Sequence, residues 1–363
     1  MNLLTIPAAW TGHELLNSQY WNYQLSREEV AEIEKVIHLS GSSDRNSIKL
    51  AQLRETFKAV SEELENGRGA VLLKGFPVQH YSEAELADAY LMLCQHMGLP
   101  IRQSNSDFDS SLREKSQFVT YIRAEAPSSS EDGKQSNDAY KFHTDRYDVL
   151  SLLCVRQAQT GGENRLASAI AIYNEMVQSN PDIVKDLFRD LPWFFEGENS
   201  WIGYPLWCIH QGKFTTQLSS TYARLSQLLP DAPRLTENQK KGLELLEATG
   251  IKLGITLRLE PGDWLMVNNH VVYHARSSWK IESGEWERLL LRVCYSPFNS
   301  RELPDTPAFR TIWGSVEAGK PRGGFLPNHQ VSPDQAISEP LSGPEAYWLD
   351  RYLKVRWMGV EQR

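Results

Sequence analysis

The chain has 363 residues, with 38 basic against 46 acidic side chains and a formal charge of −8. Its hydrophobic fraction of 41%, with aromatic residues making up 10% of the chain, is enough for a sizeable core and excludes a disordered chain. The acidic balance argues against nucleic acid or an anionic membrane as the main partner, because both attract basic surfaces.

The sequence contains no apolar run that approaches the ~18 residues of a membrane-spanning helix. Its first residues lack the basic start and apolar stretch of a signal peptide. The four cysteines are scattered and form no CxxC pair, so they do not indicate a disulfide framework. These features predict a cytoplasmic protein with reduced thiols and no membrane partner.

The N-terminal part of the chain, residues 1–100, predicts helices that lead into a strand. Capping-box patterns, a serine followed three residues later by a glutamate, start helices at Ser26 and Ser82. Apolar residues recur at helical spacing over residues 50–64. The segment GAVLLKGF, residues 69–76, has the composition of a short buried strand.

From residue 117 onward, the sequence predicts short strands separated by turns. The strand candidates are FVTYI, VLSLLCVR, KLGITLRL, DWLMV and LLLRVCY. Helical intervals interrupt them at residues 170–188 and 237–248, and proline-rich residues 297–363 predict an irregular C-terminal arm. Strands of this length at irregular spacing favour an antiparallel barrel or jelly roll. We therefore expect one catalytic jelly-roll domain over residues 1–363.

The sharpest local feature is the segment FHTDR, residues 142–146. If it forms a strand, His143 and Asp145 point to one face and Thr144 points away. An imidazole and a carboxylate that converge are two of the three ligands of a facial iron site. An isolated pattern of this kind is usually an ordinary surface feature, but here a polar loop, residues 126–139, precedes it. We expect that loop to be mobile and to close over a substrate.

A third metal ligand must come from elsewhere in the chain. Residues 261–279 offer His270 and His274, which share a face if the segment is extended. A histidine beside apolar residues is more often a hydrogen-bonded core residue than a ligand. The spacing alone therefore leaves both histidines open for either role.

Two arginines occupy one face of the apolar segment at residues 287–295. Arg288 and Arg292 are costly to bury unless anions accompany them. One reading pairs them with Glu285, Glu287 or another acid of this acidic chain. The other reading has them bind carboxylates of small molecules through fork-like hydrogen bonds.

Together, His143, Asp145, His274 and Arg288 resemble the iron(II)/2-oxoglutarate dioxygenases of the taurine dioxygenase and clavaminate synthase kind. The resemblance covers most of the chain, through GAVLLKGF, FHTDRYDVLSLLCVRQAQTGGENRLAS, PGDWLMVNNHVVYHAR and ERLLLRVCYSP. It implies a mainly β fold with α elaborations, a double-stranded β-helix or jelly roll, with iron at one mouth of the barrel.

The resemblance also implies roles for individual residues. The iron ligands would be His143, Asp145 and His274, while His270 would line the approach or hydrogen-bond within the barrel wall. Arg288 falls where the family binds the distal carboxylate of 2-oxoglutarate.

Three further positions follow from the same resemblance. Asn164 stands where the family's Gly-Gly-acid-Thr turn has a threonine that assists that carboxylate, and an amide can still donate a hydrogen bond there. Arg292 falls where relatives often bind an acidic group of the substrate. Arg146, directly after the metal segment, either reaches the pocket or is an exposed, ion-paired arginine.

The implied activity uses iron(II), 2-oxoglutarate and O2 to hydroxylate, desaturate or cyclise a small polar metabolite, releasing succinate and CO2. A carboxylate-bearing compound such as an amino acid derivative is expected, because Arg292 would otherwise be unpaired on the barrel's inner face. Two other classes remain: a non-redox, cupin-like isomerase or hydrolase, which would need no inward Arg288, and a non-catalytic binding module, which would need no complete ligand set.

Overall fold

The structure is a computed structural model, and it describes residues 1–39, 50–103, 118–123, 139–195, 200–280 and 287–324. All but the last residue of the expected loop at residues 126–139 lies outside the described residues, as does the C-terminal arm beyond residue 324. Within the described parts of the chain, no helix is long and apolar enough to cross a membrane.

The strands form two larger sheets and two hairpins. The seven-stranded sheet contains β1 (Asn22–Gln24), β2 (Ala70–Lys74), β3 (Gly98–Pro100), β4 (Thr120–Ile122), β6 (Val149–Arg156), β13 (Trp264–Asn268) and β15 (Leu289–Pro297). The four-stranded sheet contains β5 (Tyr140–His143), β7 (Asn164–Ser168), β12 (Ile255–Leu257) and β14 (Val272–Arg276). The hairpins pair β8 (Asp190–Phe195) with β9 (Ser200–Pro205), and β10 (Trp207–His210) with β11 (Lys213–Thr216).

The centre of the seven-stranded sheet explains the apolar runs of the sequence. Strand β6 lies between β13 and β15 and pairs with both in the antiparallel direction. Its alternate residues pack on opposite faces: Leu152 joins one core cluster with Leu265, and Leu153 joins another with Trp264. A strand that is covered on both faces is mostly apolar, as the segment VLSLLCVR is apart from Ser151 and the terminal Arg156.

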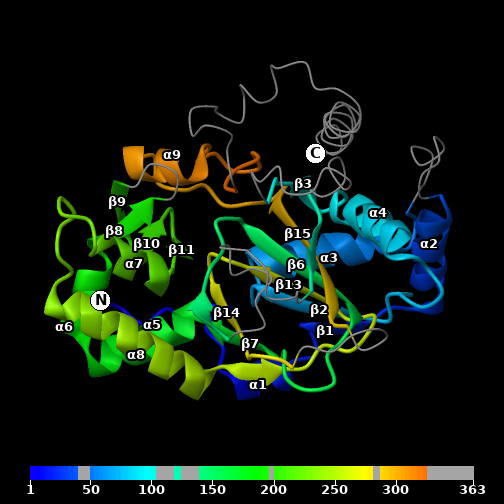
Figure 1. Ribbon diagram of the computed structural model, residues 1–363, viewed down its shortest axis with the longest axis horizontal. Coiled ribbons are helices and arrows are strands. Elements are labelled where there is room, and N and C mark those ends of the chain that lie inside the picture. Colours follow the sequence, from blue (N-terminus) through cyan, green and yellow to red (C-terminus); the bar gives the residue numbers. More distant parts are fainter. Residues whose placement is uncertain (40–49, 104–117, 124–138, 196–199, 281–286, 325–363) are drawn as a thin grey trace.

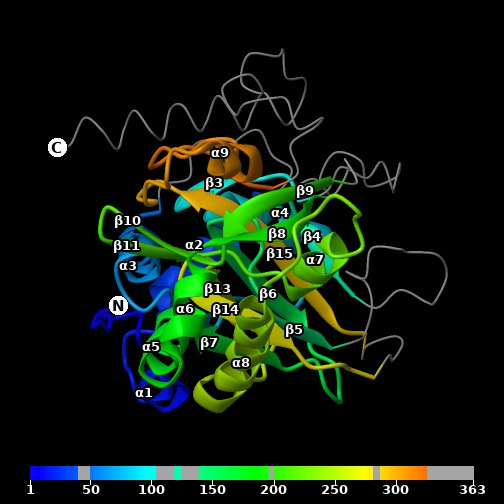
Figure 2. The ribbon, with the colours of Figure 1, turned by 90° about the vertical axis from the view of Figure 1, so that its left-hand side faces the viewer.

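Helices cover the sheets on both sides of the molecule. They are α1 (Gly12–Leu16), α2 (Arg27–His38), α3 (Leu53–Glu65), α4 (Glu83–Cys94), α5 (Ala169–Ser179), α6 (Pro181–Leu187), α7 (Ser220–Ser226), α8 (Glu237–Leu253) and α9 (Pro307–Trp313). Helices α2, α3 and α4 share a core cluster with one face of the seven-stranded sheet, and α5 and α8 contact the four-stranded sheet (Figure 1). Figure 2 brings α5, α6 and α8 to the front of the molecule.

The predicted capping boxes at Ser26 and Ser82 are confirmed, since both hydroxyls accept from the backbone three residues on. The helical interval predicted at residues 170–188 is confirmed as two helices that meet at Asn180, because Pro181 starts α6 and cannot continue α5. Helix α8 also runs five residues past its predicted end and takes up the start of the strand predicted there.

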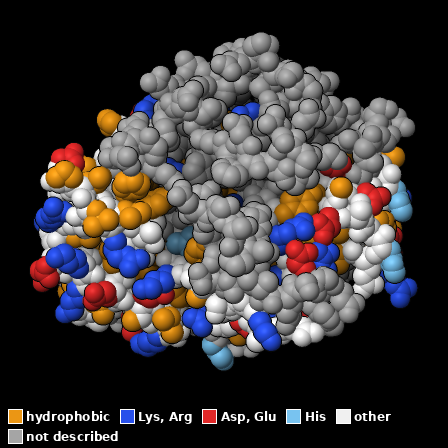
Figure 3. Space-filling view, in the orientation of Figure 1, with side chains coloured by type: hydrophobic (Ala, Val, Ile, Leu, Met, Phe, Trp, Pro, Cys, Tyr) orange, Lys and Arg blue, Asp and Glu red, His pale blue; other side chains and the backbone are white. Residues whose placement is uncertain are grey.

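Basic and acidic side chains are interspersed on the side of the molecule that carries α6 and α8 (Figure 3). Lys185 pairs with Asp182 within α6, and Lys240 pairs with Glu237 within α8. Exposed pairs at this spacing stabilise a helix only slightly. We therefore assign these charges to ordinary helix surface rather than to a binding patch.

Candidate metal centre

Strand pairing in the four-stranded sheet places two of the expected metal ligands side by side. Strands β5 and β14 are antiparallel neighbours, and His143 lies directly opposite His274 in their register. The centroids of the two imidazole rings are 4.2 Å apart. Because one histidine comes from each strand, the fold brings together residues that lie far apart in the sequence.

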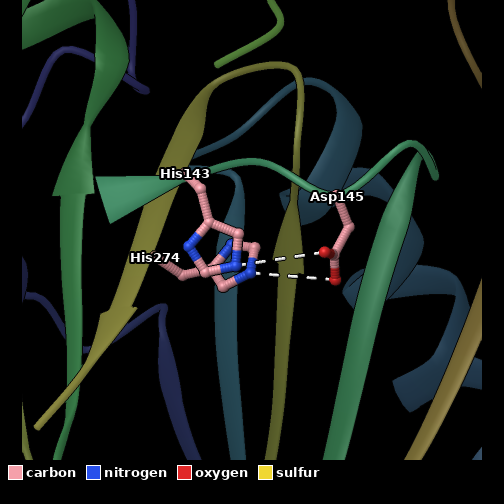
Figure 4. A group of neighbouring side chains, drawn as sticks. All are labelled: His143, Asp145 and His274. Atoms are coloured by element: carbon pink, nitrogen blue, oxygen red, sulfur yellow. Dashed lines mark ion pairs between the residues drawn. The ribbon is translucent and has the colours of Figure 1, made fainter. Parts of the chain in front are cut away.

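The third residue reaches them from outside the strand. The prediction that residues 142–146 form one strand is wrong, since β5 ends at His143. The backbone N–H of Thr144 donates to the carbonyl of Leu218, and its hydroxyl accepts from the Leu218 N–H, so the chain leaves the ladder with β14. Asp145 follows in a turn, and its side chain faces the two histidines (Figure 4).

The distances within this group fit a single metal ion. Asp145 Oδ1 lies 4.0 Å from His143 Nε2, and Asp145 Oδ2 lies 3.8 Å from His274 Nε2. One ligand atom from each residue lies within 4.8 Å of the others. Two imidazoles and one carboxylate, with further coordination positions open, form the ligand set of non-haem iron(II) oxygenases.

Both histidines are prepared to offer a nitrogen lone pair. The Nδ1 of His143 lies 2.8 Å from the Lys141 carbonyl, so Nδ1 carries the proton and Nε2 is left free toward Asp145. Burial, followed by the nearby His143, lowers the pKa of His274 to about 3, so that this imidazole is neutral near pH 7. A neutral imidazole is the form that binds a metal ion.

His270 lies apart from this group, in the turn before β14, so the expectation that it shares an extended face with His274 is wrong. Its Nε2 is 2.7 Å from Asp148 Oδ1, and its Nδ1 contacts the hydroxyl of Thr215. With both ring nitrogens engaged and 1% of its surface exposed, His270 hydrogen-bonds within the wall behind the candidate centre.

Arg288 is buried beside the four-stranded sheet, with 2% of its surface exposed. Its Nε donates to Gln157 at 3.2 Å, and its guanidinium lies over the Trp279 ring at 4.7 Å. Burial lowers its pKa to about 10. Its Nη1 is buried and has no hydrogen-bond partner among the described residues. A buried cation with a donor left over is suited to an anionic ligand.

Asn164 supplies a second donor of this kind. It is the first residue of β7 and pairs with Arg276 of β14. Its side chain lies on the same face of β7 as that of Leu166, which pairs with His274. The side chain is buried, and Nδ2 has no hydrogen-bond partner among the described residues. Just before it, Gly162 has φ +76°, and a Cβ there would lie 2.9 Å from Arg288 Nε. The glycine thus lets Arg288 approach the turn that leads into Asn164.

Arg292 points toward the metal ligands from β15. Its Nη1 lies 3.7 Å from Asp145 Oδ2, and its Nε donates to Gln103 Oε1 at 2.6 Å. Of the acids considered from the sequence, Glu287 pairs with Arg123 and Arg156, and Glu285 lies outside the described residues. Gln103 was not predicted, because no sequence pattern connects it to a strand 189 residues away. Arg146 follows Asp145 in the same turn and is partly exposed.

The comparisons with known proteins decide the family. The model for the family described as taurine catabolism dioxygenase TauD, TfdA family matches residues 35–295. The chain belongs to this family. The expected enzyme class, an iron(II)/2-oxoglutarate dioxygenase that uses O2, is thereby confirmed together with its cofactors.

Two curated relatives cover most of this dioxygenase. FR-33289 synthase of Streptomyces rubellomurinus is 28% identical over an alignment of 345 residues, and the match covers 88% of this chain and 97% of the relative. Taurine hydroxylase-like protein SAT17 of Stachybotrys chartarum is 24% identical over an alignment of 313 residues, and the match covers 78% of this chain and 77% of the relative.

Solved structures share the fold of this dioxygenase. Asparagine oxygenase in complex with Fe(II), 2S,3S-3-hydroxyasparagine and succinate matches with a TM-score of 0.59 and 17% identity, over 76% of this chain and 93% of that chain. The non-haem iron oxygenase OrfP in complex with Fe and alpha-ketoglutaric acid matches with a TM-score of 0.56 and 14% identity, over the same shares. The expected fold, mainly β with helical elaborations in a jelly roll, is confirmed.

Proposed function

We propose that this dioxygenase hydroxylates a small polar metabolite that carries a carboxylate, such as an amino acid derivative. The observation that carries this proposal is Arg292, a half-buried cation whose side chain is 13% exposed and whose Nη1 lies 3.7 Å from Asp145 Oδ2 at the candidate metal centre. A substrate carboxylate bound there would be held beside the metal. Desaturation or ring closure of the same substrate would require the same placement.

In this proposal, His143, Asp145 and His274 bind iron(II). Their support is the spacing of the ligand atoms, the free Nε2 of His143 and the neutral imidazole of His274. When bound, iron supplies the activation of O2 that accompanies conversion of 2-oxoglutarate into succinate and CO2. The protein contributes the placement of the reactants and the exclusion of water.

The 2-oxoglutarate site is assigned to Arg288 and Asn164. Each side chain is buried and keeps one donor without a partner among the described residues. A carboxylate between them would satisfy both donors and neutralise the arginine, which is more favourable than leaving either group unpaired. Trp279 covers the guanidinium of Arg288 and limits its access to water. A cupin-like isomerase or hydrolase would have no use for this cation.

The substrate site is assigned to Arg292 and to Arg146, which directly follows Asp145 in the chain. Gln103 holds Arg292 by accepting from its Nε, while Asp145 lies close enough to attract the guanidinium. Two structures with the same fold support an amino acid derivative: asparagine oxygenase was solved with 3-hydroxyasparagine, and OrfP with hydroxylated arginine. A substrate carboxylate bound to Arg292 would then lie close to the metal ligands.

The experiment that tests this function compares matched substrates. The iron-loaded enzyme is incubated with 2-oxoglutarate and a panel of amino acids and their derivatives, each paired with its carboxamide. Succinate release and product mass are scored together. We expect substrate oxidation only with carboxylate-bearing compounds, because a carboxylate can accept a forked pair of hydrogen bonds from the guanidinium of Arg292 and a carboxamide cannot. Efficient turnover of a carboxamide in preference to its acid would contradict the proposed substrate class.

The enzyme is expected to oxygenate its substrate without halogenating it. Asp145 occupies a position that a halide would need, and a halide would have to displace this anionic ligand. Turnover in saturating chloride, with mass detection of products, checks this expectation. A chlorinated product from the unaltered protein would show that Asp145 does not hold its place on the metal.

A further inference from the structure

The turn that carries Asp145 is fastened by parts of the chain that are remote in sequence. We call residues 145–148 the ligand turn. The side chain of Asn269 accepts a hydrogen bond from the Asp145 N–H at 3.0 Å. The backbone N–H of the same asparagine donates to the Asp148 carbonyl at 2.9 Å. One residue therefore holds both ends of the ligand turn.

The C-terminal arm fastens the same turn from another side. Arg322, which is fully buried, places its Nη2 2.6 Å from Asp148 Oδ1 and its Nε 3.0 Å from Asp148 Oδ2. Two residues later, the N–H of Gly324 donates to the Arg146 carbonyl at 2.7 Å. Between them, Gly323 has φ +80°, and a Cβ at this position would collide with the Arg146 carbonyl.

These contacts matter for the metal centre because Asp145 has no strand to support it. The two histidines are held by the ladder between β5 and β14, whereas Asp145 lies beyond the end of β5. The bonds between Thr144 and Leu218 hold the chain just before Asp145, and the bonds made by the ligand turn hold it from Asp145 onward. Groups that orient metal ligands from behind typically change metal affinity 10–100-fold when they are removed.

We propose that Asn269 and Arg322 are positioning residues that hold Asp145 in place for the metal, so that the C-terminal arm completes the centre. The proposal rests on the proposed iron ligation by Asp145. Asn269 acts on the Asp145 backbone directly, and Arg322 acts at the other end of the turn through Asp148. Neither residue contacts the metal ligand atoms themselves.

The test uses the metal-free full-length chain and Co(II), whose visible absorption reports its coordination without turnover. Asn269→Ala and Arg322→Met are expected to weaken Co(II) binding about tenfold or more and to change the spectrum of the bound ion. Both variants should release more succinate for each substrate oxidised. Arg322→Lys keeps the charge and should recover part of the affinity. Arg310→Ala, an exposed arginine in the same arm that pairs with Asp305, should bind Co(II) like the unaltered chain.

Loss of Arg322 leaves Asp148 as a buried carboxylate with only His270 as a side-chain partner among the described residues, so the single variant is expected to lose stability. Asp148→Asn combined with Arg322→Met removes both charges, and Asn269→Ala leaves both in place, so either of these variants carries the test. If variants with the thermal stability of the unaltered chain bind Co(II) within twofold of it, the positioning role is wrong. If Asp145→Ala also binds Co(II) unchanged, the proposed ligand set has failed instead.

Discussion

Replacing His143, Asp145 or His274 by alanine is expected to abolish iron binding and turnover. Iron content should fall from about one ion per chain to nearly none, because each replacement removes one of only three protein ligands. His270→Gln is the matched control. The glutamine amide still donates to Asp148, so that variant should retain the metal with at most a modest loss of stability. Iron content and succinate release in each purified variant provide the measurement.

The outcome that contradicts this assignment is specific. If His270→Gln loses iron while His274→Ala retains it, then His270 is the iron ligand and His274 is not. If all four variants keep iron, the metal binds elsewhere in the chain. Thermal unfolding of each metal-free variant separates lost ligation from lost folding, because His274 is partly exposed and its replacement leaves no unpaired charge in the core.

The two arginines of the β15 segment are expected to separate in function. Arg288→Ala should chiefly weaken 2-oxoglutarate binding, and Arg292→Ala should chiefly weaken binding of the substrate. Removing one partner of a desolvated, charge-assisted pair typically costs ~2–5 kcal/mol, which is a factor of tens to thousands in affinity. Titration of 2-oxoglutarate and then of substrate into each iron-loaded variant without O2 gives both constants.

A conservative replacement sharpens this test. Arg288→Lys keeps a positive charge but not the forked pair of donors, so it should bind 2-oxoglutarate more weakly than the unaltered chain and more tightly than Arg288→Ala. Equal weakening of 2-oxoglutarate binding by Arg288→Ala and Arg292→Ala would refute the division between the two arginines.

The strands and the helix starts could be predicted because the residues that determine them are neighbours in the sequence. The strand β6 is apolar on both faces, and the helices α2 and α4 begin at short capping patterns that a sequence displays directly. His143 and Asp145 were expected to lie together because both would point to one face of a strand, and that reason is wrong. The strand stops at His143, and the carboxylate turns back because Thr144 bonds to Leu218 instead.

The groups behind the centre were not predictable, because their partners lie far away in the sequence. Asp148 and Arg322 are 174 residues apart, and no spacing rule joins them. His270 and His274 were equivalent by spacing, but His270 lies in the turn between β13 and β14, whereas His274 lies in β14. The ring of Trp279 stacks on the guanidinium groups of Arg276 and Arg288, a contact that no local sequence pattern indicates. Such roles depend on tertiary contacts rather than on local pattern.

The most direct test of the central claim follows the oxygen atoms. The iron-loaded enzyme is supplied with 2-oxoglutarate, an oxidisable carboxylate substrate and O2 enriched in oxygen-18, and both products are analysed by mass. The account predicts one heavy oxygen in succinate and, for a hydroxylation, one in the substrate product. Succinate without label, or oxidised substrate formed without succinate, would contradict it.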